Sequence, residues 1–213
     1  MILRSAYATV GPVDVETEIE RSRFICWLRR VESEDAARTV IADARQAHRQ
    51  ANHHCSAFVV GADAALRRSN DDGEPAGTAG RPMLETLTHA GVSDVVAVVI
   101  RYFGGVKLGT GGLARAYSGA VSEALDRAPR IERIPVLHHD LHLSHADAGR
   151  VEHALRGAGF EIVDTTYDHD VRLRLAVPVA GEGLPALLRS LGVPPEALTT
   201  TGDGWHDQSR PAH

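Results

Sequence analysis

The residues with the most distinctive chemistry in this 213-residue chain form one glycine-rich run, RYFGGVKLGTGG, over residues 101–112. The run follows apolar residues 95–100, which predict a strand buried on both faces, and a helical pattern starts at about Thr110. A glycine-rich turn between a strand and a helix exposes backbone N–H groups beside the positive end of the helix dipole. Lys107, the only lysine of the chain, lies in this loop. The run therefore predicts a binding site for an anion.

Three interpretations of this run stay open. The loop amides bind a phosphate of RNA or of a small ligand, with Lys107 as a point charge and arginines as bidentate donors. Alternatively, the loop is a protein interface, or its glycines serve only close packing and positive φ angles. Neither a Walker A nor a dinucleotide-binding motif is present. The predicted anion- or RNA-binding residues are Arg101, Tyr102, Gly104, Gly105, Lys107, Gly109, Thr110, Gly111, Gly112 and Arg115.

Aromatic residues precede the glycines in the same run. Tyr102 and Phe103 are candidates for stacking on nucleic-acid bases. Because side chains alternate at the end of a strand, we expect one of the two to belong to the core.

A second polar loop, SNDDGEP over residues 69–75, places three carboxylates within four residues. Such a group suits a divalent cation or a general base, but the spacing is not that of an EF-hand. The Asn, Asp, Gly and Pro residues also explain the loop as a turn, so we expect no metal and no cofactor. If the two loops face each other, they form a polar groove. The predicted partners across it are Asp71, Asp72, Glu74 and His54.

Other candidates for chemistry carry weaker signals. The sequence His53-His54-Cys55 lacks further ligands at zinc spacing, which favours a hydrogen-bonding role for the histidines. Cys26 and Cys55 form neither a zinc motif nor a disulfide framework, and we interpret them as buried thiols in a reducing compartment. No serine lies in a G-x-S-x-G motif. The sequence therefore assigns no catalytic residue.

Charge is unevenly distributed along the chain. Residues 1–130 carry 16 basic and 16 acidic side chains, whereas residues 131–213 carry 7 basic and 12 acidic ones. An acidic chain is not a general nucleic-acid coat, although the first part leaves room for a local basic patch. No apolar stretch approaches the roughly 20 residues that cross a bilayer, and the N-terminus has no signal-peptide pattern. We expect a cytoplasmic protein without a membrane partner.

Two domains and a tail are expected to position these residues. In the first domain, residues 1–130, alternating or apolar runs predict strands, and helical spacing predicts helices from Ser33 to about Arg49, from about 81 to 90 and from about 110 to 128. The second domain, residues 131–202, has the β-α-β-β-α order of a small ferredoxin-like domain. Residues 203–213 are predicted to be a flexible tail. The strands expected in the first domain are 13–19, 23–28, 55–60, 65–69 and 94–100.

The long motif, together with shorter ones, resembles a known family. Gly91, Val95-Val96 and the run from Arg101 to Gly109 are similar to the signature of the IMPACT/YigZ family. RSRF at 21–24, HCSA at 54–57, DDGEP at 71–75 and TAG at 78–80 match in order, and the resemblance covers nearly the whole chain.

The resemblance implies an α+β fold with two domains. The first would have the fold of a ribosomal-protein domain, with helices on a four-stranded sheet and a left-handed β-α-β crossover, which is rare in general. The second would be similar to a small domain of elongation factor G, as in bacterial YigZ-type members.

The same resemblance implies a role near translation. Eukaryotic members regulate translation during amino-acid starvation, by competing for an activator of an initiation-factor kinase. Bacteria lack that pathway, so what transfers is binding of RNA, the ribosome or a protein partner. The leading hypothesis is a non-enzymatic binding protein. The alternative is an enzyme acting on a phosphorylated small molecule or nucleotide, in which the acidic loop holds Mg²⁺ and Lys107 the phosphate.

Overall fold

The structure is a computed structural model that describes residues 6–209. The chain divides into two compact units, residues 6–132 and residues 133–208. Each unit packs helices on antiparallel strands, which confirms the predicted α+β class with two domains. The likeness to a ribosomal-protein domain and to an elongation-factor domain stays a prediction. None of the helices in residues 6–209 is long and apolar enough to cross a membrane.

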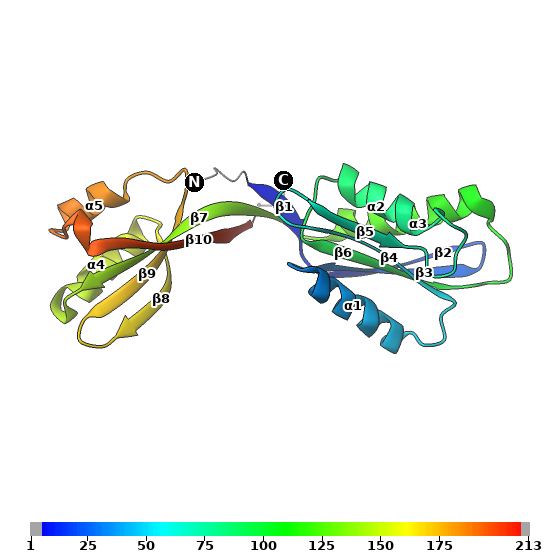
Figure 1. Ribbon diagram of the computed structural model, residues 1–213, viewed down its shortest axis with the longest axis horizontal. Coiled ribbons are helices and arrows are strands. Elements are labelled where there is room, and N and C mark those ends of the chain that lie inside the picture. Colours follow the sequence, from blue (N-terminus) through cyan, green and yellow to red (C-terminus); the bar gives the residue numbers. More distant parts are fainter. Residues whose placement is uncertain (1–5, 210–213) are drawn as a thin grey trace. The chain divides into compact units, whose positions relative to one another are not determined.

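The N-terminal unit is a five-stranded sheet with helices on both faces (Figure 1). Helix α1 (Glu34–Ala47) covers one face, and helices α2 (Gly80–His89) and α3 (Gly109–Arg127) cover the other. The resemblance implied four strands, and the fifth is β5, which pairs with β4. In sheet order the strands are β2 (Val13–Ile19), β3 (Ser22–Arg30), β6 (Val95–Tyr102), β4 (His53–Val60) and β5 (Leu66–Asn70).

The central strand β6 explains the longest apolar run of the chain. Residues 95–100 are fully buried, because helices cover both faces of the sheet. Val95, Ala97 and Val99 join the core under α2 and α3, whereas Val96, Val98 and Ile100 join the core under α1. The same alternation sends the next two residues to opposite faces, which decides what each can do at the end of the strand.

The ends of α1 and α2 follow from local chemistry. Ser33 caps α1 as predicted, because its hydroxyl accepts a hydrogen bond from the Ala36 N–H. Helix α2 begins one residue earlier than the predicted Arg81, and it ends before Gly91, which has a φ of +64°. Its first amides are held by a carboxylate of the acidic loop, described below.

The C-terminal unit has the predicted β-α-β-β-α order and one further strand. Its elements are β7 (Arg130–Leu143), α4 (His145–Gly157), β8 (Glu161–Tyr167), β9 (Val171–Pro178), α5 (Leu184–Ser190), a 3₁₀ turn (Pro195–Ala197) and β10 (Leu198–Ser209). Strand β9 lies between β7 and β8, and β10 pairs with β7. Its core is made mainly of leucine and valine side chains from the strands and both helices.

Two strands differ from the sequence prediction. Residues 203–209 belong to β10 rather than to a flexible tail, because they pair with the long strand β7. Strand β1 (Tyr7–Val10) also pairs with β7 and was not predicted. Residues 210–213 of the expected tail lie outside the described residues.

Candidate functional site

The glycine loop joins β6 to α3, as the sequence predicted. Leu108 precedes the first turn of α3 and offers no side-chain cap, and that turn contains no acidic residue. The backbone N–H groups of Gly109, Thr110 and Gly111 donate no hydrogen bond to any acceptor within residues 6–209. Gly109 has a φ of +69°, which only glycine adopts without strain. The loop therefore leaves donors open at the positive end of a 19-residue helix.

A groove with a volume of about 390 Å³ lies between this loop and the acidic loop, and we call it the glycine groove. The structure thus brings five predicted site residues together: Glu74, Arg101, Lys107, Gly109 and Thr110. Lys107 is exposed, and its ammonium has no ion pair with any residue that the structure describes. The full lining is Asn52, His53, Glu74, Pro75, Arg101, Phe103, Lys107, Leu108, Gly109, Thr110 and Leu113.

Arg101 is part of the wall of the groove, where the sequence predicted a free guanidinium for an anion. Its side chain is 5% exposed, and its Nη1 donates to Glu74 Oε1 at 2.7 Å. Its Nη2 donates to the Ser22 hydroxyl at 3.3 Å, and its Nε is buried without a partner. The positive charge of Arg101 therefore offsets the negative charge of Glu74, and Lys107 supplies the positive charge that faces solvent.

Tyr117 completes this buried network, a role that the sequence did not reveal. Its hydroxyl donates to the same Glu74 Oε1 at 2.7 Å, and burial raises the pKa of Tyr117 far above its usual value. Tyr117 therefore stays a neutral donor. The sequence placed it in the apolar stripe of α3, where its ring does pack edge-on against Phe24 at 5.3 Å. In the sequence, only the hydroxyl group of Tyr117 indicated that this residue has a polar partner.

The other two carboxylates of the acidic loop have structural partners, which corrects their predicted place in the groove. Asp71 accepts hydrogen bonds from the backbone N–H groups of Gly77, Ala79 and Gly80 at 2.8 to 3.0 Å. Partial burial raises the pKa of Asp71, but these three backbone donors outweigh it and hold the pKa below its usual value. Asp71 thereby caps the start of α2.

Asp72 ties the acidic loop to the other face of the sheet. One of its carboxylate oxygens pairs with Arg45 of α1 at 2.7 Å, and the other accepts from the backbone N–H of His54 at 2.7 Å. Neither Asp71 nor Asp72 lines the glycine groove.

Tyr102, His54 and Arg115 also lie outside the groove. The Tyr102 hydroxyl is 2.9 Å from His48 Nδ1 beneath α1, because strand alternation turns it away from Arg101. His54 is buried on the same side, with its Nε2 3.1 Å from the His48 carbonyl. Arg115 lines a separate hollow together with Lys107 and Gly112.

The remaining glycines of the run serve the backbone. A Cβ on Gly104 would lie 2.0 Å from the Arg21 carbonyl oxygen, so this position requires glycine for close chain packing. Gly105 has a φ of +90°. Gly111 lies in the exposed first turn of α3 beside the groove. For Gly104 and Gly105 the packing interpretation is sufficient.

Six groove residues were absent from the predicted site set: Asn52, His53, Pro75, Phe103, Leu108 and Leu113. The Asn52 side-chain oxygen accepts from the Phe103 N–H at 2.8 Å, and His53 Nδ1 lies 2.9 Å from the Asp72 carbonyl, which fits its predicted hydrogen-bonding role. Phe103 is 46% exposed beside the loop. Phe103 carried a signal in the sequence as an aromatic residue at the end of a strand, and His53 as part of the pair His53-His54.

Neither the thiols nor the metal-binding side chains in the described residues form a second candidate centre. Cys26 and Cys55 are buried and form no disulfide bond, and burial raises the pKa of both thiols to about 12. No group of three or more His, Cys, Asp or Glu side chains in the described part of the chain is placed to hold a metal ion.

Comparisons with known proteins match both units. The Impact N-terminal domain model matches residues 20–125, and a domain model of unknown function, DUF1949, matches residues 141–182. The chain is 41% identical over 172 residues to the IMPACT family member YigZ of Escherichia coli, covering 80% of this chain and 84% of that protein. It is 42% identical over 179 residues to the IMPACT family member YvyE of Bacillus subtilis, covering 83% and 81%. A crystal structure of a hypothetical protein, 34% identical, matches with a TM-score of 0.65 over 99% of this chain and 100% of that one.

Proposed function

We propose, from the premise that this chain belongs to the IMPACT family as a YigZ-type bacterial member, that it is a binding protein working near translation. It binds RNA through a backbone phosphate held in the glycine groove. One observation carries the proposal: among residues 6–209, the first amides of α3 have no acceptor, and they lie beside the exposed Lys107, which forms no ion pair there. The link to translation comes from the family resemblance, because eukaryotic members regulate translation.

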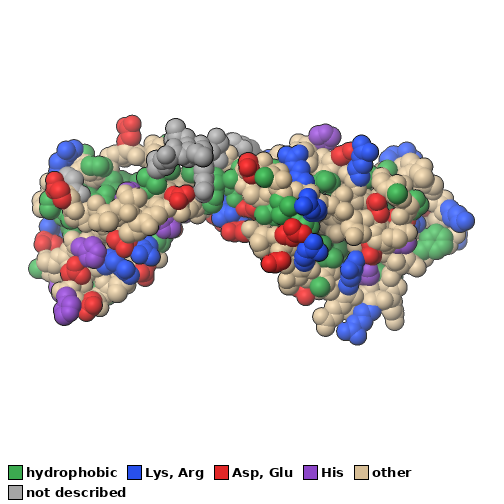
Figure 2. All heavy atoms as spheres, viewed as in Figure 1, with side chains coloured by type: hydrophobic (Ala, Val, Ile, Leu, Met, Phe, Trp, Pro, Cys, Tyr) green, Lys and Arg blue, Asp and Glu red, His purple; other side chains and the backbone are tan. Residues whose placement is uncertain are grey.

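The groove chemistry supports a single phosphate rather than an extended basic track. Glu74 is neutralised by Arg101, so Lys107 and the helix dipole provide the local positive potential. Phe103 supplies an exposed ring on which a base next to that phosphate stacks. Figure 2 shows acidic side chains among the basic ones on the visible face of the N-terminal unit, which also favours a local contact.

Replacing Lys107 with alanine tests the proposal. Each phosphate neutralised by a lysine contributes about one unit to the salt dependence of RNA binding. We expect Lys107→Ala to weaken binding of a short single-stranded RNA and to reduce the slope of log K against log salt by about one. Fluorescence anisotropy across a salt series measures both.

Arg115→Ala is the matched control. Arg115 is an exposed cation near the start of α3, but it lies outside the glycine groove. The Arg115→Ala variant should leave the slope of log K against log salt unchanged. An unchanged slope in Lys107→Ala, or equal losses in both variants, would remove the support for this groove.

The enzyme alternative loses its metal-binding residues in this geometry. It required Asp71 and Asp72 to hold Mg²⁺, and both carboxylates are engaged by backbone amides and Arg45. A thermal-shift screen with ATP and Mg²⁺ still separates the two functions. Stabilisation that Asp71→Asn or Asp72→Asn abolishes, at unchanged folding, would favour the enzyme.

A further inference from the structure

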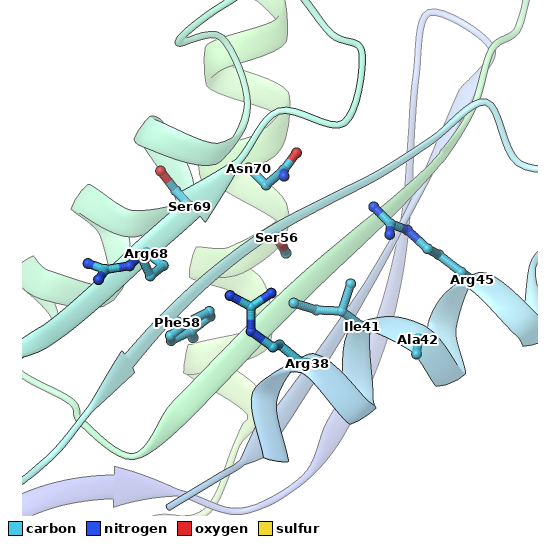
Figure 3. A pocket seen from close by; sticks show the side chains of 9 residues that line it. All are labelled: Arg38, Ile41, Ala42, Arg45, Ser56, Phe58, Arg68, Ser69 and Asn70. Atoms are coloured by element: carbon cyan, nitrogen blue, oxygen red, sulfur yellow. The ribbon is translucent and has the colours of Figure 1, made fainter. Parts of the chain in front are cut away.

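Helix α1 covers only part of its sheet face, and a pocket of about 440 Å³ lies between this helix and the β4–β5 hairpin (Figure 3). We call it the α1–β5 pocket. It shares no lining residue with the glycine groove. Its lining comprises Arg38, Ile41, Ala42 and Arg45 of α1, Ser56 and Phe58 of β4, and Arg68, Ser69 and Asn70 of β5.

All charged side chains that line the α1–β5 pocket are arginines. Arg38 donates from Nε and Nη2 to Glu34, Arg45 donates from Nη2 to Asp72, and Arg68 donates from Nη1 to a backbone carbonyl. A guanidinium has five N–H donors, so each of the three keeps donors that these bonds do not use. The pocket therefore offers unused donors from two elements to an anion.

The floor of the pocket contains a hydroxyl group. Ser56 as a residue is 4% exposed, and it lines the pocket. Its Oγ is not one of the buried side-chain atoms left without a partner in residues 6–209, so we interpret it as a group that the pocket leaves accessible to a ligand. Phe58 and Ile41 lie beside it and give the floor an apolar surface.

We propose that the α1–β5 pocket binds a small organic phosphate, a phosphate monoester with a compact apolar or aromatic body. A dianionic monoester has three terminal oxygens and about two negative charges, whereas a carboxylate has two oxygens and one charge, so the monoester suits a pocket whose charged lining consists only of arginines. The volume lies in the range of small-molecule sites, which is about 300–1,000 Å³. The phosphate lies at the arginine rim, and the body of the ligand covers Phe58 and reaches the Ser56 hydroxyl.

Isothermal titration of the full chain with phenyl phosphate tests this site, with inorganic phosphate and benzoate as comparators. We expect saturable one-to-one binding that is tighter for phenyl phosphate than for either comparator. Arg68→Ala should weaken it by about tenfold or more, as expected for the loss of a charge-assisted contact. Ser56→Ala should weaken it less.

Arg67→Ala is the matched control. Arg67 is the neighbouring arginine of β5, but it pairs with Val59, which faces the opposite core. It should leave phenyl phosphate binding unchanged, and circular dichroism confirms that each variant folds. Equal weakening by Arg67→Ala and Arg68→Ala would overturn the site. Binding of inorganic phosphate as tight as phenyl phosphate would show an adventitious ion only, and would also overturn it.

Two further arms separate this site from other sources of phosphate and from the glycine groove. Arg68-dependent binding of a 5′-phosphorylated oligonucleotide without binding of phenyl phosphate would overturn the small-molecule assignment. Lys107→Ala should leave phenyl phosphate binding intact, because Lys107 does not line this pocket. A loss of phenyl phosphate binding in Lys107→Ala would overturn the independence of the α1–β5 pocket.

Discussion

At the scale of single residues, the wall of the glycine groove contains a buried ion pair between Arg101 and Glu74. The Arg101 guanidinium carbon lies 5.4 Å from the Phe24 ring centre and 5.5 Å from the Phe103 ring centre. The Glu74 carboxylate accepts hydrogen bonds from Arg101 and from the Tyr117 hydroxyl. A buried ion pair stabilises the folded state little more than a well-packed pair of apolar side chains would. Removing one partner of the ion pair, however, leaves the charge of the other partner buried and uncompensated. We interpret the role of the ion pair as positional, because it joins the end of β6 to the acidic loop and to α3.

Glu74→Ala tests this network. The substitution leaves the buried Arg101 guanidinium without its partner, so we expect the free energy of unfolding to fall by about 3–5 kcal/mol. Urea denaturation followed by circular dichroism measures the change. Glu85→Ala is the control, because Glu85 forms an exposed i,i+4 pair with Arg81 that is worth about 0.5 kcal/mol or less. Equal losses in the two variants would contradict the network.

Asp71 gives the protein an acid-sensitive contact. Its folded-state pKa is lowered, so it contributes stability above the unfolded pKa of about 3.9, and that stability is lost as the pH falls through the lower folded value. Asp71→Asn removes the titration. We expect the variant to be less stable at neutral pH and to lose less stability on acidification. Urea unfolding at pH 7 and below pH 4 measures the difference, and parallel pH profiles would contradict it.

The two thiols should be unreactive in the folded chain. Burial raises the pKa of Cys26 and Cys55 to about 12, and only the thiolate attacks a disulfide reagent. We expect labelling by an aromatic disulfide at pH 8 to be slow in buffer and complete in denaturant. Rapid native labelling of either cysteine, assigned by mass spectrometry, would refute the burial.

Single residues also show what the sequence predicted and what it left hidden. Lys107 and the open amides were predictable because the signal is local: a strand, glycines and a helix start in twelve residues. The sequence placed Glu74 across a groove from the glycine run, but it did not predict the ion pair of Glu74 with Arg101, because the two residues are 27 positions apart and only the fold sets their contact. The α1–β5 pocket gave no local signal in the sequence, because its lining residues come from three separate elements.

At the scale of elements, predictability followed hydrophobic patterning. Strand β6 and helix α3 have strong apolar patterns, and both were predicted to within a few residues. Strand β10 reads LTTTGDGWHDQS, with two glycines and few apolar residues, so nothing local separates it from a loop. Its strand state comes from pairing with β7, a contact between segments far apart in the sequence.

The glycines of the loop between β6 and α3 should differ in their tolerance of a side chain. Gly104→Ala places a Cβ 2.0 Å from the Arg21 carbonyl oxygen, so the backbone must move, and we expect a loss of about 2 kcal/mol or more. Gly119→Ala is the control, because no atom lies within 4 Å of a Cβ there in mid-helix. It should stabilise by up to about 1 kcal/mol through helix propensity. Thermal and urea unfolding compare them, and a tolerated Gly104→Ala would contradict the close approach.

At the scale of the whole molecule, the two units differ in charge. Residues 1–130 are neutral overall, whereas residues 131–213 carry five more acidic than basic side chains. A net negative unit repels nucleic acid at long range, and salt screens that repulsion over a Debye length of about 10 Å at 0.1 M. If the glycine groove binds RNA, the acidic unit therefore restricts binding to contacts strong enough to overcome the repulsion.

Neutralising exposed acids of the C-terminal unit tests this restriction in the full chain. Asp168, Glu182 and Glu196 are exposed and take part in no ion pair that the described structure shows, so the triple variant Asp168→Asn, Glu182→Gln and Glu196→Gln should fold normally. We expect it to bind single-stranded RNA about two- to tenfold more tightly at low salt, because net charge sets the long-range field. The gain should shrink towards zero as salt rises and screening shortens the field. A gain that persists at high salt would indicate a direct contact with the C-terminal unit, and no gain at any salt would show that its charge does not regulate binding.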